Sequence, residues 1–144
     1  MLTFEICSSN KDYIAVTVQG YERAAIGEFY DDNWLNVVVE INSGAFRGRF
    51  FASFQVFEFS DFYDQLQLLY DTLKGKAIFS TLEGQLEISI TCNVLGNLEV
   101  SGFAMDEAGV GNQLNFQFQL DQTYLPKILG ELATIVNSFP IRNA

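Results

Sequence analysis

An acidic and aromatic stretch in the first third of the chain holds the residues that could do chemistry. It places Glu28, Asp31 and Asp32 beside Tyr30 and Trp34. Paired carboxylates can hydrolyse glycosidic bonds, but nothing in the sequence fixes their separation or raises the pKa of either. The same residues form an acidic patch with aromatic anchors, which suits binding to a partner protein. The plain alternative is a solvated loop in which Asp and Asn form turns.

The composition excludes most other catalytic chemistry. The 144 residues include no histidine, which removes Ser-His-Asp and Cys-His catalysis and histidine-ligated metal sites. The two cysteines, Cys7 and Cys92, form no CxxC motif, and we expect both to be reduced and buried. The glycines follow no phosphate-binding spacing, and no carboxylates have EF-hand spacing. We therefore expect no enzyme activity, no catalytic residue, no metal and no cofactor.

The charge balance limits the partners. Eight Lys and Arg stand against 18 Asp and Glu, which gives a net charge of −10 at pH 7. Such a surface repels nucleic-acid phosphates and anionic membranes, so we expect neither as a partner. The first residues lack the basic and apolar regions of a signal peptide, and no apolar run reaches the ~20 residues of a membrane helix. These features favour a cytoplasmic protein.

The elements that must position the acidic stretch are mostly strands. Hydrophobic residues make up 49% of the chain and charged residues 18%, as in a folded protein, and the length predicts a single domain over residues 1–144. Period-two alternation predicts short strands on both sides of the stretch. A run from Ala45 to Glu58 reads as one long strand. Four phenylalanines within nine residues of each other, from Phe46 to Phe54, predict that it lies at the centre of a sheet.

Two segments follow a helical period instead. The stripe of Phe62, Leu66, Leu69, Tyr70 and Leu73 predicts a helix over about 60–74, with Ser60 or Asp61 as its N-cap. A second stripe predicts a helix over about 124–138, and the position of Pro126 favours Thr123 as its cap. The fold class is thus α+β and mostly β, an antiparallel curved sheet or sandwich with two amphipathic helices.

Two further groups of polar residues could bind a partner. Asp61 and Asp64, at the start of the first helix, would make a second acidic edge. The segment 121–126, Asp-Gln-Thr-Tyr-Leu-Pro, is either a polar recognition corner or a strand-to-helix junction in which Asp and Thr satisfy backbone donors. The junction is the simpler interpretation.

The sequence resembles the WapI-type immunity proteins of bacteria over nearly its whole length. The resemblance rests on Asp32-Asn33-Trp34-Leu35 before Val37–Val39, on Glu58, Phe62, Leu66, Leu69, Leu73, Gly75 and Ala77, on Glu83, Leu86 and Gly96, and on Asp121-Gln122-Thr123-Tyr124-Leu125 and Phe139-Pro140. It implies a protein that binds and neutralises the toxic C-terminal domain of a large bacterial protein.

A toxin domain that acts on nucleic acid is expected to be basic, and a chain at −10 would suit it. The residues expected to make the contact come from charge and aromatic character, not from the resemblance. They are Glu28, Tyr30, Asp31, Asp32, Trp34, Asp61 and Asp64. The function would be occlusion of the toxin's active groove.

A second hypothesis is a small-ligand-binding module. Fourteen phenylalanines could line an apolar cavity inside a curved sheet, or they could simply fill the core. A structural or interaction protein of another role is also compatible with the pattern, and the oligomeric state is left open.

Overall fold

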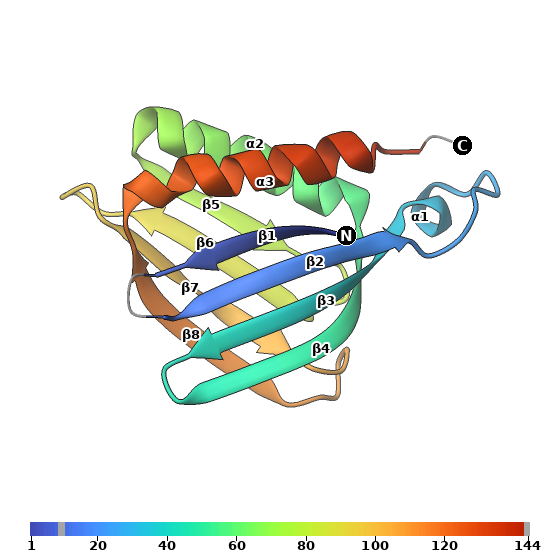
Figure 1. Cartoon of the computed structure of the whole chain (residues 1–144), viewed down its shortest axis with the longest axis horizontal. Coiled ribbons are helices and arrows are strands. Elements are labelled where there is room, and N and C mark those ends of the chain that lie inside the picture. The colour runs from blue at the N-terminus through green and yellow to red at the C-terminus, as the bar shows by residue number, and fades with distance from the viewer. Residues whose placement is uncertain (9–10, 143–144) are drawn as a thin grey trace.

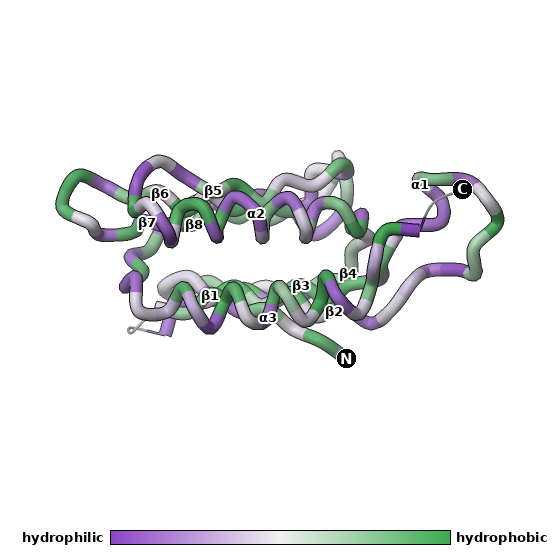
Figure 2. Tube along the Cα trace, turned by 90° about the horizontal axis from the view of Figure 1, so that it is seen from above, coloured by the Kyte–Doolittle hydropathy of each residue, from purple (hydrophilic) through white to green (hydrophobic). Residues whose placement is uncertain are grey.

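The strands form two antiparallel sheets that stack face to face, with two long helices along one rim (Figures 1 and 2). A computed structural model describes residues 1–8 and 11–142. The first sheet has the order β1 (Leu2–Cys7), β2 (Tyr13–Tyr21), β3 (Trp34–Ser43) and β4 (Phe46–Gln55). The second has the order β5 (Gly75–Ser80), β6 (Leu86–Cys92), β7 (Leu98–Met105) and β8 (Gln113–Leu120). The expected class, mostly β with a sandwich of antiparallel sheets, is confirmed.

The helical segments are the short α1 (Phe29–Asp32), α2 (Val56–Thr72), a 3₁₀ turn (Gln122–Tyr124) and α3 (Leu125–Ser138). The two long helices, α2 and α3, each cover one edge of a sheet. Helix α2 packs along β5, α3 packs along β1, and the two helices pack against each other. Figure 2 shows the result from above: each helix lies in line with one sheet. The apolar stripe of each helix therefore closes one rim of the space between the sheets.

A cluster of phenylalanines fills the interior beneath these helices. The ring of Phe79 on β5 lies 5.7 Å from Phe4 and 5.5 Å from Phe54, between centroids. It lies 5.4 Å from Phe59 and 5.5 Å from Phe62, both on α2. All five side chains are at most 1% exposed. The rings thus pack on one another from both sheets and the helix, so these phenylalanines fill the core rather than line a cavity.

The prediction of one long, central strand from Ala45 to Glu58 is wrong in two respects, the position where the strand ends and its position in the sheet. Strand β4 stops at Gln55, and α2 begins at the next residue. Moreover, β4 lies at the edge of its sheet, not at the centre. The outward-facing Phe51 is 65% exposed, so the run of phenylalanines does not require cover on both faces. The number of phenylalanines does not distinguish a central strand from an edge strand, because an edge strand also buries one of its faces.

Helix α2 starts four residues earlier than expected because of one buried carboxylate. Neither Ser60 nor Asp61 is the N-cap; the cap is Gln55. The Glu58 side chain reaches back to accept the backbone N–H of Gln55 at 2.7 Å, which is half of a capping box. Its second oxygen accepts the N–H of Leu82 at 2.6 Å, in the turn after β5. Glu58 therefore joins the first sheet, α2 and the second sheet.

The C-terminal helix also begins differently. Thr123 was expected as its cap, but Asp121 caps a 3₁₀ turn instead by accepting the N–H of Thr123 at 2.9 Å. Helix α3 then starts at Leu125, with Pro126 in its first turn. Proline is well placed there, because the first N–H groups of a helix have no intrahelical partner.

The burial of Glu58 predicts an unusual pH dependence of stability. Burial raises the pKa of Glu58 from its ordinary 4.5 to about 7, although the N–H groups of Gln55 and Leu82 oppose this. Between these values the folded state keeps a proton that the unfolded state has lost, so this residue lowers stability as the pH rises through the window. The free energy of unfolding of the native protein should fall by roughly 3 kcal/mol relative to Glu58→Gln from about pH 5 to about pH 8.

Urea unfolding of both proteins across this pH range measures the difference. The variant is a fair reference because glutamine stays neutral and, like the protonated carboxyl group, has one carbonyl oxygen and one donor group. Parallel pH profiles for the two proteins would show that Glu58 does not titrate in this way.

Candidate functional site

The expected acidic stretch forms a loop that projects from one end of the sandwich. Residues 22–33 leave β2, extend beyond the sheets and return through the single turn of α1 to β3 (Figures 1 and 2). The loop presents apolar and acidic side chains together: Ile26 is 62% exposed, Tyr30 is 59% exposed, and Glu28 and Phe29 are also exposed. The Phe29 and Tyr30 rings meet edge to face at 5.3 Å. This mixture is typical of a protein-binding surface.

Asp32 does not belong to that surface, and its assignment as a contact residue is corrected. Only 2% of it is exposed. One carboxylate oxygen accepts the N–H of Ile26 at 2.8 Å, and the other accepts the N–H of Gly27 at 2.9 Å. These donors, Ile26 first, hold the pKa of Asp32 below its ordinary value. Gly27 turns the chain at a φ of +93°, which favours glycine. Asp32 therefore shapes the loop from inside.

The loop is fixed to the end of the chain by a buried amide. Asn33 is fully buried, and its Nδ2 donates to the backbone oxygens of Phe29 at 2.7 Å and Arg142 at 2.8 Å. Its Oδ1 accepts the N–H of Arg142 at 2.7 Å. We call this pairing of Asn33 with the backbone of Arg142 the loop clasp. The amide donates to the Arg142 carbonyl and accepts from the Arg142 N–H, as the backbone of a neighbouring strand would.

The Arg142 side chain strengthens the same connection. Its guanidinium lies 3.4 Å from the centre of the Tyr21 ring, a cation–π contact. One of its nitrogens donates to the backbone oxygen of Arg23 at 3.0 Å. The Tyr21 hydroxyl in turn donates to the oxygen of Pro140 at 2.6 Å, and its ring meets Phe139 at 5.5 Å. Segment 139–142 thus supports both ends of the loop.

The loop also rests on the junction between β4 and α2. Gln55 donates its side-chain amide to the backbone oxygen of Tyr30 at 2.9 Å. The N–H of Val56 donates to the oxygen of Asn33 at 2.9 Å. Trp34, another expected contact residue, begins β3 beside these bonds and is half-buried. The backbone of α1 is therefore held from two sides, while the side chains of Glu28 and Tyr30 stay exposed.

The second acidic edge lies on the helix that leaves this junction. Asp61 and Asp64 are both exposed on the N-terminal half of α2. Asp61, with Glu83, adds to the negative potential at Glu58. The first residue of α2 is bonded to Asn33, so this edge and the loop occupy the same end of the molecule (Figure 1).

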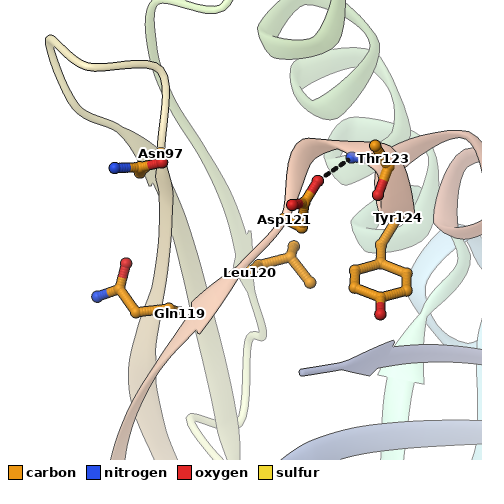
Figure 3. Close-up of a pocket in the computed structure, with 6 residues that line it drawn as sticks. All are labelled: Asn97, Gln119, Leu120, Asp121, Thr123 and Tyr124. Carbon is orange, nitrogen blue, oxygen red and sulfur yellow. Dashed lines mark hydrogen bonds between the residues drawn. The ribbon is translucent and has the colours of Figure 1, made fainter. Parts of the chain in front are cut away.

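The polar corner after β8 agrees with the junction interpretation. Asp121, Thr123 and Tyr124 line an open pocket of about 320 Å³ together with Asn97, Gln119 and Leu120 (Figure 3). The carboxylate of Asp121 is engaged with Thr123, whose N–H and hydroxyl lower the pKa of Asp121. Its visible role is to start the helical segment.

The two cysteines are free and half-buried, rather than fully buried as expected. Burial, and then the hydrogen bond to Glu5, raise the pKa of Cys7 to about 12, so its thiol stays protonated at neutral pH. Among residues 1–8 and 11–142, no helix is long and apolar enough to span a membrane. In the same residues no three His, Cys, Asp or Glu side chains are grouped to hold a metal ion.

Sequence reasoning missed the residues that hold the loop and two that it exposes. The missed supports are Asn33, Arg142 and Tyr21, which lie far apart in the sequence, so no local pattern connects them. Ile26 and Phe29 did leave a signal, since apolar side chains inside an acidic loop are unusual unless they bind something.

The support from Arg142 can be tested by hydrogen exchange. In Arg142→Ala the guanidinium contacts to Tyr21 and Arg23 are lost, and amides over 22–33 should exchange at least about tenfold faster. Amides of the core strands should be unaffected. Arg47→Ala is the matched control, because it removes an exposed arginine from β4. Equal exchange over 22–33 in both variants would mean that the Arg142 side chain does not order the loop.

Comparison with known proteins adds the family. The sequence profile of the family described as "Immunity protein WapI-like family" matches residues 5–140. A comparison with curated proteins finds no match. The profile covers both sheets, both long helices and the projecting loop, which is nearly the whole chain. The chain therefore belongs to the WapI-like immunity protein family.

Proposed function

We propose that this protein binds the toxic domain of a cognate bacterial protein and neutralises it by covering its active groove with the projecting loop. The observation that carries the proposal is the loop itself. It is a supported projection that exposes acidic and aromatic side chains on a chain with a net charge of −10. Family membership supplies the immunity role. The partner, the groove and the loop as contact are the proposed parts.

Electrostatics would govern the encounter. Toxin domains that act on nucleic acid need a basic groove to hold phosphates. Glu28 and Asp31 on the loop, with Asp61 and Asp64 on α2, would offer that groove carboxylates in place of its substrate. Opposite potentials steer association and can raise its rate far above the neutral ~10⁵–10⁶ M⁻¹s⁻¹. We place this encounter in the cytoplasm, where such a toxin would meet its substrate.

The exposed aromatic side chains would supply most of the binding energy. Tyr30 stands on α1 beside Phe29, and Ile26 is exposed on the same loop. Interfaces usually depend on a few such anchors surrounded by polar residues. Because Asp32 and the loop clasp hold the backbone, little entropy would be lost when the loop binds. The mechanism requires no reaction on this chain, so the role is binding rather than catalysis.

A charge-reversal variant tests the electrostatic part. Glu28→Lys with Asp31→Lys should slow association with the cognate toxin domain by at least about tenfold at low salt. Asp32 is left intact, because its substitution would disturb the loop itself. The control is Asp71→Lys with Glu99→Lys, which changes the charge equally. Asp71 lies in the last turn of α2, and Glu99 lies at the start of β7, next to the hairpin after β6. The end of α2 and this hairpin both lie at the end of the molecule opposite the loop (Figure 1). Equal slowing by both pairs would show that only net charge matters.

Truncation of the main anchor tests the contact itself. Tyr30→Ala should weaken binding by about 2 kcal/mol, mostly through faster dissociation, because a buried aromatic anchor is lost. Phe51→Ala is the matched control, since Phe51 is similarly exposed but lies on β4. Surface plasmon resonance separates the two rates. If Tyr30→Ala dissociates like the native protein while Phe51→Ala dissociates faster, the contact surface is the face of the first sheet instead.

A further inference from the structure

The edge strands of the two sheets differ in whether other groups cover their outer backbone. The described residues form four such edges, which are β1, β4, β5 and β8. Helix side chains bond to the backbone of two of them. Glu131 on α3 accepts the N–H of Glu5 in β1 at 3.0 Å, and Gln65 on α2 accepts the N–H of Ile78 in β5 at 2.9 Å. Gln65 also donates to the oxygen of Ile78 at 3.3 Å, so its amide acts as a short substitute strand.

The other two edges lack this cover. Among residues 1–8 and 11–142, no group bonds to the outer backbone edge of β8, and on β4 only the N–H of its last residue, Gln55, is bonded, to Glu58. An uncovered edge is a template for another strand unless charge, proline or a bulge protects it. The side chains on β4 and β8 therefore decide which edge can pair.

Strand β4 carries charge protection. Arg47 and Arg49 point outward from it, and both are exposed. Arg49 lies 3.5 Å from Glu40 on β3 and 5.6 Å from the centre of the Phe51 ring, so its charge stays at the sheet surface. Pairing of β4 with β4 of a second copy would bring these arginines together across the new ladder, which is unfavourable.

Strand β8 carries no protection of any kind. It has eight residues, no proline and no charge, and its pairing with β7 runs from Met105–Gln113 to Leu98–Leu120 without a bulge. Its apolar side chains point into the core. Its outward side chains are four exposed amides: Gln113, Asn115, Gln117 and Gln119. The first two bond to each other at 2.9 Å, and the last donates to Glu99 at 3.4 Å.

We propose that β8 pairs antiparallel with β8 of a second copy of this chain, which joins two four-stranded sheets into one. A two-fold axis needs a self-complementary surface. Any register that keeps the apolar residues of both strands on the core side places an amide opposite an amide. Amides donate and accept at once, so each register is complementary to itself. A row of charged side chains would not have this property.

The uncharged strand also explains why a second copy can approach despite a charge of −10. Charges repel strongly only within about a Debye length, roughly 8 Å at physiological salt, and β8 places none on the line of contact. One strand pair buries less than the ~800 Å² per partner of a standard stable interface. The dimer should therefore dissociate in the micromolar range.

The test measures the mass of the purified full chain by analytical ultracentrifugation from low to high micromolar concentration. The native protein should approach twice the monomer mass, and amides over 113–120 should exchange more slowly at the higher concentration. Gln117→Lys should raise the dissociation constant at least about tenfold, because each copy would then place a lysine in the row of amides at the contact. Asn115→Lys is a second variant in case the first does not fold.

The matched control is Thr91→Lys. Thr91 is exposed on the same face of the same sheet, but β6 is paired on both sides, so this variant should dimerise like the native protein. A native protein that stays monomeric at the highest concentration would overturn the proposal. So would a dimer that survives both β8 substitutions, or one that Thr91→Lys dissociates equally well.

Discussion

The pairing of the Asn33 amide with the backbone of Arg142 is the interaction on which the candidate site depends. Asn33 is fully buried, and its side-chain amide bonds to backbone groups of the loop and of the C-terminal segment. An unpaired polar group in such a place costs about 1–3 kcal/mol, so the amide specifies one arrangement of the two segments. Without it the twelve residues of the loop would gain conformational freedom that binding would have to remove. A projecting loop can be exposed and still ordered because its supports are inside.

The sandwich places this loop at one end and leaves that end free. Helices α2 and α3 cover one rim of the two sheets, and Phe79 with the four phenylalanines around it fills the space below them. Glu58 connects the start of α2 to the turn after β5, close to where β3 and β4 meet the loop. The same junction that begins the helix also supports α1 through Gln55. Fold and candidate site therefore share their supports.

Much of the fold could be predicted from the sequence, and the exceptions have physical causes. Alternation found the strands, and the apolar stripe of α3 found that helix, because both patterns record which face is buried. The start of α2 could not be found, because Glu58 resembles any surface glutamate until its partner Leu82 is known. The acidic loop was found from its composition. The residues that support the loop from inside could not be predicted. Asp32 differs from Asp31 only through contacts made in three dimensions, and Arg142 lies at the far end of the chain.

The central claim is that the projecting loop is the surface that meets the toxin. Hydrogen exchange of the protein alone and in complex with its cognate toxin domain tests it most directly, because every amide is reported and no substitution is needed. The account predicts slower exchange in the complex over residues 24–33 and the first turns of α2, with the outer faces of both sheets unchanged. Protection confined to the sheet faces or to the hairpin after β6, with the loop exchanging as in the free protein, would contradict it.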